Sequence, residues 1–139
     1  MSSKTSLQAA EALYSGAIRL LRMVRAEDAQ AGIGPAQLSA LSVLVFAGEK
    51  TVGELAALEQ VRPPTMSRIV DGLVQKKLVE RVSSSSDRRS VQVTATPAGR
   101  KLLLAGKARR VRALAKRFES LTRHEVETLH AAAQIMARL

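Results

Sequence analysis

The 139-residue chain contains no cysteine and no tryptophan, and it has only one tyrosine and two phenylalanines. Without cysteine, disulfides, thiolate metal ligands and thiol redox switches are excluded, so any sensing has to be non-covalent. The scarcity of aromatic rings disfavours a binder of single-stranded nucleic acid, because such proteins stack bases on aromatic side chains. Among nucleic acids, duplex DNA is therefore favoured.

Long apolar runs are also missing from the sequence. The longest, over 41–47, is interrupted by Ser42 and is far too short to span a bilayer. The first six residues lack the basic region and the continuous apolar core of a secretory signal. We therefore expect no membrane partner and a cytoplasmic location.

Acidic residues are few relative to basic ones: 12 Asp and Glu stand against 22 Lys and Arg, which gives a net charge of +10. This balance favours a polyanion or an anionic membrane surface as the partner. A membrane-surface protein is disfavoured because the basic residues are interleaved with a polar segment and do not border a Leu-rich insertion face.

Motifs for catalysis or metal binding are not apparent. The sequence has no glycine-rich phosphate loop, no Ser-His-Asp order and no paired-carboxylate motif. His124 and His130 are six residues apart, which places them on different helix faces, and no carboxylate cluster completes a site. We therefore predict that the protein is not an enzyme and that it has no metal and no cofactor.

Apolar residues recur at helical spacing in the first half of the chain. The spacing predicts helices over about 7–30, from 35 to a stop at Gly48, after a capping box formed by Thr51 and Glu54, and from 63 to about 76. In the last of these, the apolar stripe consists of Met66, Ile69, Val70 and Leu73. The opposite, outward-facing side then carries Thr65, Ser67, Arg68, Asp71 and Gly72.

The period then changes from helical to alternating. Segments 78–82 and 91–94 predict two strands, and the polar stretch 83–90 joins them as a long hairpin. Thr96 followed by Pro97 begins a long helix that runs to about 121. Thr122 and Glu125 form a second capping box, which begins the last helix.

This order of elements predicts a mainly α protein with a small two-stranded β wing, that is, a winged helix-turn-helix. We expect a single domain over 1–139, with the winged core at about 35–95 and dimerisation helices at about 7–30 and 97–139. A homodimer is expected because the apolar positions of these end helices exceed what so small a core can cover.

Several short motifs in this order are similar to those of the MarR family of transcriptional regulators. They are TVGELA from Thr51, PTMSRIVDGL from Pro64, LVER from Leu78, DRR from Asp87 and TATPAG from Thr94. Each is weak alone, but their joint order and spacing extend over about half of the chain. The resemblance implies a sequence-specific regulator of double-stranded DNA that binds a pseudo-palindromic operator as a homodimer. It further implies a repressor that a small aromatic or anionic effector releases from DNA.

The resemblance also implies that the helix from 63 to 76 enters the major groove. Its candidate DNA-binding residues are Arg62, Pro64, Thr65, Ser67 and Arg68. Arg68 is the strongest of them, because its planar fork of donors suits guanine edges or phosphate oxygens. Ser67 could equally be an ordinary solvent-facing residue. Arg62 stands where a capping Ser or Asp is common, and it could replace the phosphate contact that the amide-free Pro63-Pro64 cannot make.

The hairpin supplies the second set of candidates. The resemblance implies that Arg89 reaches into the minor groove, that Asp87 orients arginine side chains and that Arg88 contacts a phosphate. Taken alone, such a charged turn would simply be a solvated turn, and it is the flanking strands and the preceding helix that favour DNA binding. Arg100 and Lys101 begin the next helix beside the wing and are possible phosphate contacts.

Lys77 departs from the family pattern, which usually has glycine before the first wing strand. A left-handed backbone at this position would cost a lysine about 1 kcal/mol. The alternative function is that of a non-specific architectural DNA-binding protein, for which the high charge alone would suffice.

Overall fold

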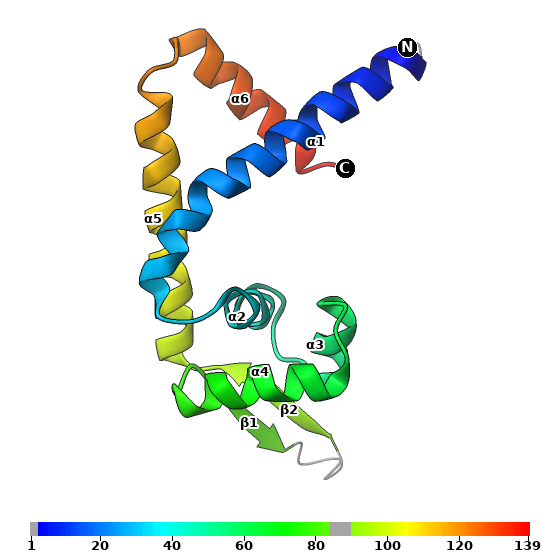
Figure 1. Cartoon of the computed structure of the whole chain (residues 1–139), viewed down its shortest axis with the longest axis vertical. Helices are drawn as coiled ribbons and strands as arrows, with labels where there is room; N and C mark the ends of the chain where they lie inside the picture. The colour runs from blue at the N-terminus through cyan, green and yellow to red at the C-terminus, as the bar shows by residue number, and fades with distance from the viewer. Residues whose placement is uncertain (1–2, 84–89) are drawn as a thin grey trace. The chain divides into compact units, whose positions relative to one another are not determined.

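The computed structural model describes residues 3–83 and 90–139. The described chain is helical apart from one antiparallel hairpin, as Figure 1 shows. This confirms the predicted fold class, mainly α with a two-stranded wing. In chain order the elements are α1 (Ser3–Arg25), the 3-10 helix η1 (Ala26–Ala31), α2 (Pro35–Ala47), α3 (Val52–Leu58), α4 (Pro63–Gln75), β1 (Val79–Ser83), β2 (Val91–Ala95), α5 (Pro97–Phe118) and α6 (Arg123–Met136).

The chain divides into two compact units. The first combines Met1–Glu27 with Ala108–Leu139, and the second is Asp28–Lys107. We call the first the arm unit and the second the head unit. Among the described residues, no single helix is long and apolar enough to cross a membrane, and only the broken pair Ser3–Ala31 and Pro35–Ala47 meets that standard jointly.

The predicted starts of α2 to α6 are confirmed, whereas the first helix, predicted over about 7–30, begins at Ser3 and gives way to the 3-10 helix η1 after Arg25. Thr51 Oγ1 accepts from the Glu54 N–H at 3.1 Å, and Glu54 Oε1 accepts from the Thr51 N–H at 3.3 Å. Thr122 and Glu125 form the same reciprocal capping box before α6. The helices α2, α4 and α5 each begin with a proline, whose missing N–H costs nothing in the first turn.

The hydrophobic core lies in the head unit. Met66, Val70 and Leu73 are fully buried, as the helical stripe predicted, and Ile69 is half-buried. They pack with buried residues of α2, α3, the hairpin and α5, namely Ala40, Leu41, Leu44, Val45, Leu55, Ala56, Leu78, Val79, Val93 and Leu103. This packing fixes the rotation of α4 about its axis, and hence the residues that α4 presents outward.

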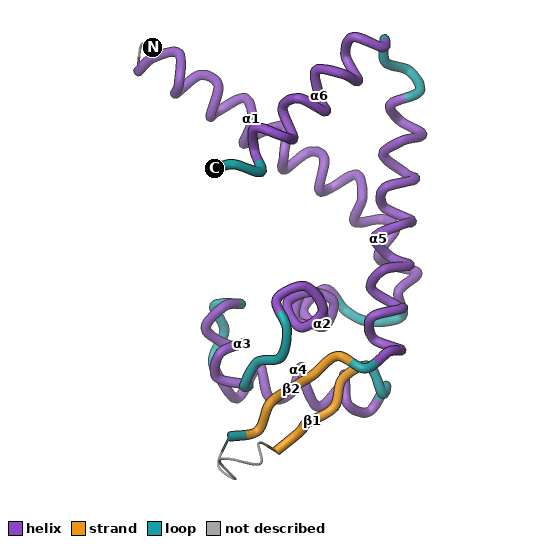
Figure 2. The backbone as a smooth tube through the Cα atoms, turned by 180° about the vertical axis from the view of Figure 1, so that it is seen from behind, coloured by secondary structure: helices purple, strands orange, loops and turns teal. Residues whose placement is uncertain are grey.

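The hairpin pairs β1 with β2 in the register Arg81 opposite Val93, and Figure 2 shows that α5 follows β2 directly. Lys50 adds a one-residue bridge to Val93, in which the two N-to-O distances are 3.2 and 2.7 Å. The sequence did not predict this bridge, because a single paired residue produces no alternating pattern.

The described part of the arm unit buries almost no side chain. Of its described residues only Val24 is buried. Leu13, Leu21, Leu129 and Met136, which the apolar pattern singled out, are each more than 40% exposed. A single copy of the chain therefore leaves the apolar faces of the arm unit open to solvent.

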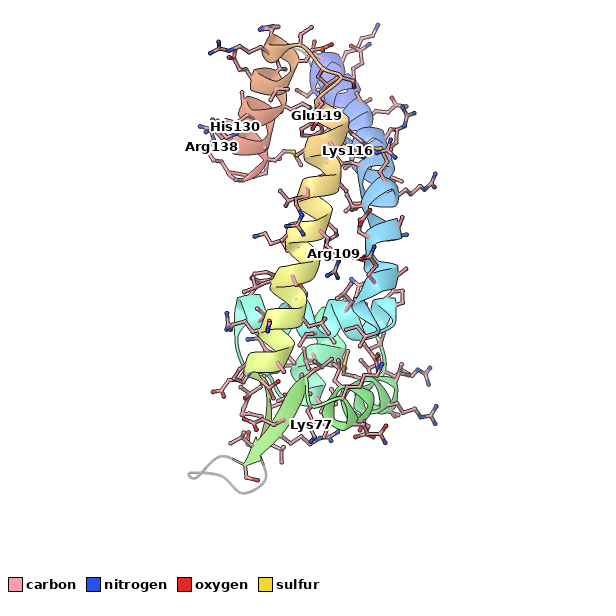
Figure 3. The ribbon with its side chains drawn as sticks, turned by 90° about the vertical axis from the view of Figure 1, so that its left-hand side faces the viewer. Lys77, Arg109, Lys116, Glu119, His130 and Arg138 are labelled. Atoms are coloured by element: carbon pink, nitrogen blue, oxygen red, sulfur yellow. The ribbon has the colours of Figure 1, made fainter. Side chains whose placement is uncertain are left out.

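Lys77 adopts the left-handed conformation that the sequence placed in question, with φ of 59°. Figure 3 labels it at the passage from α4 to β1. Its N–H donates to the Val74 carbonyl at 2.9 Å, and the Leu78 N–H donates to the Leu73 carbonyl at 3.0 Å. This is a Schellman motif with lysine in the position that usually holds glycine. The helix therefore ends in the ordinary way, with the strain carried by the Lys77 backbone.

Lys77→Gly is expected to raise the free energy of unfolding by about 1 kcal/mol, because glycine adopts a positive φ without steric cost. Thermal unfolding followed by circular dichroism measures this as a melting temperature a few degrees higher. Gln75→Gly, in the helical last turn of α4, is the control and should lower the stability by a similar amount. A melting temperature that falls in both variants would contradict the strain at Lys77.

Candidate nucleic-acid interface

The outward side of α4 carries the residues predicted to bind DNA. Pro64, Thr65 and Arg68 are exposed, while Ser67 is half-buried. They lie away from the stripe formed by Met66, Val70 and Leu73, whose burial holds them outward. The structure thus brings four of the five predicted α4 residues onto the N-terminal half of one helix, and Arg62 immediately precedes them.

The start of α4 has few backbone donors. Arg62 is the N-cap residue and is exposed, and its side chain makes no capping hydrogen bond. Pro63 and Pro64 have no N–H, and the Met66 N–H bonds the Arg62 carbonyl at 3.1 Å. Thr65 is therefore the only one of the first three helical residues with a backbone N–H, and the exposed N-cap residue Arg62 adds a charged donor to this end of the helix.

The turn between α3 and α4 contains a second residue with positive φ, Gln60, at 55°. The Gln60 N–H donates to Ala57 at 3.3 Å and the Val61 N–H donates to Ala56 at 3.0 Å, which is again a Schellman motif. The sequence predicted a turn here but not this conformation, because glutamine gives no signal for positive φ. This geometry ends α3 and directs the chain into α4.

An ion pair joins α4 to the hairpin. Arg81 Nη2 on β1 lies 2.5 Å from Asp71 Oδ1 on α4, with side chains 34% and 58% exposed. Asp71 was predicted to face outward, but its partner was not predicted. One indication of this partner was present in the sequence, because an acidic residue on a surface predicted to bind phosphates needs a cation nearby to neutralise it. The pair links β1 to α4 and neutralises the charge of Asp71.

The tip of the hairpin, with Asp87, Arg88 and Arg89, lies outside the described residues. Arg100 and Lys101 are exposed near the start of α5. Thr96 holds this start in place: its Oγ1 donates to the Lys77 carbonyl at 2.7 Å and accepts from the Gly99 N–H at 3.1 Å. Both basic residues are thus held close to the turn that ends α4.

Metal binding finds no support in the described part of the chain. No three His, Asp or Glu side chains there lie close enough together to hold an ion. Apart from Asp71, which is paired with Arg81, the polar groups that α4 and the start of α5 expose include donors suited to an anionic partner.

Comparison with known proteins decides the family. The sequence pattern of the MarR family matches residues 31–90. The HTH-type transcriptional regulator Mb0904 of Mycobacterium bovis is 36% identical over 122 residues, which cover 88% of this chain and 85% of that protein. The chain belongs to the MarR family. The resemblance of the short motifs to this family is thereby confirmed.

Solved structures confirm the fold of this MarR protein. A MarR family protein from Bacillus stearothermophilus superposes with a TM-score of 0.80 at 25% identity, covering 99% of this chain and 96% of that one. A mutant of MepR from S. aureus, solved bound to an oligodeoxyribonucleotide, gives a TM-score of 0.71 at 21% identity, covering 94% and 96%. These structures show the winged helix-turn-helix fold, in which α3 and α4 form the helix-turn-helix and β1 and β2 the wing. With the family and its relatives, the MarR chain is a DNA-binding transcription regulator.

Proposed function

We propose that this MarR protein is a homodimeric repressor that binds a specific pseudo-palindromic operator in double-stranded DNA. The observation that carries the proposal is the outward position of Arg68 on α4, opposite a fully buried stripe. A helix with one buried face and one polar face fits the major groove, where a guanidinium can pair with a guanine edge. Repression is the mode of action that the family resemblance implies.

Each predicted site residue has a role in this proposal. Arg68, Thr65 and Ser67 read the major groove, while Arg62 and Pro64 bring the start of α4 against the DNA backbone. Arg89 enters the minor groove at the wing, Asp87 orients it and Arg88 binds phosphate. Arg100 and Lys101 contact phosphate from the start of α5. Because the bacterial chromosome lies in the cytoplasm, the protein acts there.

Selection of bound fragments from the genome tests this function. The selected fragments should share an inverted repeat whose half-sites lie about one helical turn, or a multiple of it, apart. Deletion of the gene should raise transcription from promoters that carry the repeat. Fragments without a common sequence would instead favour the architectural DNA-binding protein, whose binding ignores sequence.

We also propose that the whole chain is one MarR domain, with the winged core over 35–95 and dimerisation helices over 7–30 and 97–139. The arm unit supports this, because its apolar side chains have no core of their own in a single copy. A second copy would cover them.

Sedimentation at micromolar concentration should therefore give the mass of a dimer. Leu21→Glu and Leu129→Glu, which place charge on these apolar faces, are expected to shift the protein toward monomer and lower its melting temperature. Leu58→Glu is the control, because Leu58 is 57% exposed but lies in the head unit. A monomeric wild type would rule the dimer out.

A small aromatic or anionic effector completes the proposal. The arm unit has 11 Lys and Arg against 5 Asp and Glu. Within the described chain, Nε of Arg109 in this unit is buried and has no hydrogen-bond partner. A buried guanidinium nitrogen favours an anionic acceptor.

Small aromatic carboxylates such as benzoate should release DNA from the wild type, and Arg109→Ala should abolish that response without weakening DNA binding.

Arg89→Ala is expected to weaken binding to A·T-flanked operators more than to G·C-flanked ones, because a narrow minor groove attracts an inserted guanidinium most strongly. The slope of log affinity against log salt should become shallower by about one unit. Titrations over a salt series with both flank types measure this, and the melting temperature should not change. A mutant that keeps the wild-type slope and flank preference would show that the wing does not reach the groove.

A further inference from the structure

A glycine lies in the last turn of α4, the helix proposed to read DNA. Gly72 lies on the outer arc of α4, one turn after Arg68, where glycine weakens a helix compared with other residues. A Cβ at this position would overlap Nε2 of Gln37 and lie 3.5 Å from its Cδ. The carboxamide of Gln37 therefore occupies the space that a side chain at position 72 would fill.

Gln37 comes from the first turn of α2 and is half-buried. Lys76 Nζ, just after α4, donates to the Gly32 carbonyl at 2.8 Å and so holds the chain leading into α2 against this end of α4. No group of the described chain forms a hydrogen bond with the Gln37 carboxamide. Its two N–H donors and its oxygen are thus held at the flank of α4 without a protein partner.

The width of the major groove determines which part of the DNA the Gln37 carboxamide can contact. The groove is about 12 Å wide, and an α-helix with its side chains is about 10–12 Å across. When α4 occupies the groove, α2 cannot enter beside it. A group that α2 holds at the flank of α4 meets the wall of the groove, which is the sugar-phosphate backbone.

We infer that Gln37 donates a hydrogen bond from Nε2 to a backbone phosphate of the duplex that α4 enters, and that Gly72 keeps this position free. The inference rests on the proposed function, because it requires α4 to lie in the major groove. It assigns a DNA-binding role to α2, outside the residues predicted from the sequence. A carboxamide is neutral, so this contact adds affinity without releasing a counterion.

The test uses the full-length protein with two duplexes of equal length, one recovered by the genomic selection and one of random sequence. Gln37→Ala should weaken binding to both by a similar factor, about tenfold, and should leave the salt slope unchanged. Gln37→Glu keeps the shape of the side chain but repels phosphate, so it should bind more weakly still. Gln30→Ala, which removes an exposed carboxamide from η1, should bind as the wild type does.

Gly72→Ala tests the same contact independently, because it should also weaken DNA binding. Its methyl group would push aside only the far end of a flexible side chain, so the fold should be retained and the melting temperature should not fall. DNA binding should nevertheless weaken as in Gln37→Ala, and the double variant should bind no worse than either single one.

Two results would overturn the contact while leaving the proposed function intact. Wild-type affinity in Gln37→Glu would show that the side chain only packs against Gly72. A changed base preference at one position of each half-site would make Gln37 a base reader instead of a phosphate contact. If the wild type itself bound the selected and random duplexes equally, sequence-specific regulation would fail, whereas the uniform loss in Gln37→Ala would still support the phosphate contact.

Discussion

Gly99→Ala is expected to destabilise the protein by about 2 kcal/mol or more, although alanine is the better helix former. Gly99 is buried near the start of α5. A Cβ there would overlap the Leu78 carbonyl oxygen and lie 3.1 Å from Leu41 Cδ1. Neither Leu78 nor Leu41 can move easily to make room. The Leu78 carbonyl oxygen accepts a hydrogen bond from the Thr96 N–H at 3.0 Å, and Leu41 is fully buried in the core.

The melting temperature should therefore fall by roughly 5–10 °C, as measured by circular dichroism or calorimetry. Gly53→Ala in α3 is the matched control, because a Cβ at that position meets nothing nearer than Thr51 Oγ1 at 3.9 Å. That variant should be as stable as the wild type or slightly more stable. If Gly99→Ala also melted at the wild-type temperature, the close approach of α5 to Leu78 would be wrong.

We expect the same close approach to affect DNA binding. Thr96 ties the start of α5 to the end of α4 through two hydrogen bonds, from its Oγ1 to the Lys77 carbonyl and from its N–H to the Leu78 carbonyl. This junction holds Arg100 and Lys101 close to the turn that ends α4. A Cβ at Gly99 would push α5 away from Leu78, so the residual folded protein should also lose affinity for random-sequence DNA.

The helices could be predicted from the sequence because their signals are local. The capping boxes at Thr51 and Thr122 and the stripe through Met66 and Val70 depend on residues three or four positions apart. The hairpin was predicted from its alternation in the same way. The strained position of Lys77 could also be anticipated, because the family pattern has glycine there.

The contacts that complete the candidate site could not be predicted, because they join side chains from different elements. Neither Asp71 with Arg81 nor Gln37 with Gly72 is marked by sequence spacing, since each pair depends on how packing rotates two elements toward each other. Gln60 is different, because its positive φ is local but its residue type gives no signal. The sequence therefore predicts the helix that we propose reads DNA, and the structure adds the neighbouring residues that position this helix.

Arg68→Ala is expected to have the largest effect on operator recognition. Arg68 is exposed on α4, and its side chain has no hydrogen bond or ion pair within the described chain, so its guanidinium is available for DNA. A bidentate pair with guanine contributes about 1–3 kcal/mol of discrimination at each half-site. A dimer has two such contacts, so affinity for the selected duplex should fall by more than a hundredfold if each contributes at least about 1.4 kcal/mol.

Measurements on selected and random-sequence duplexes separate base reading from phosphate binding. Arg68→Ala should lose far more affinity for the selected duplex, and base preference should relax at one position of each half-site. Arg68→Lys should keep much of the binding to random DNA but little of the discrimination, because an ammonium group retains the charge without the planar fork. Arg100→Ala is the matched control and should weaken both duplexes alike. Because the Arg68 side chain is exposed and has no hydrogen bond or ion pair within the described fold, the melting temperature of Arg68→Ala should stay at the wild-type value. Equal losses of affinity on both duplexes would show that Arg68 contacts a phosphate and not a base.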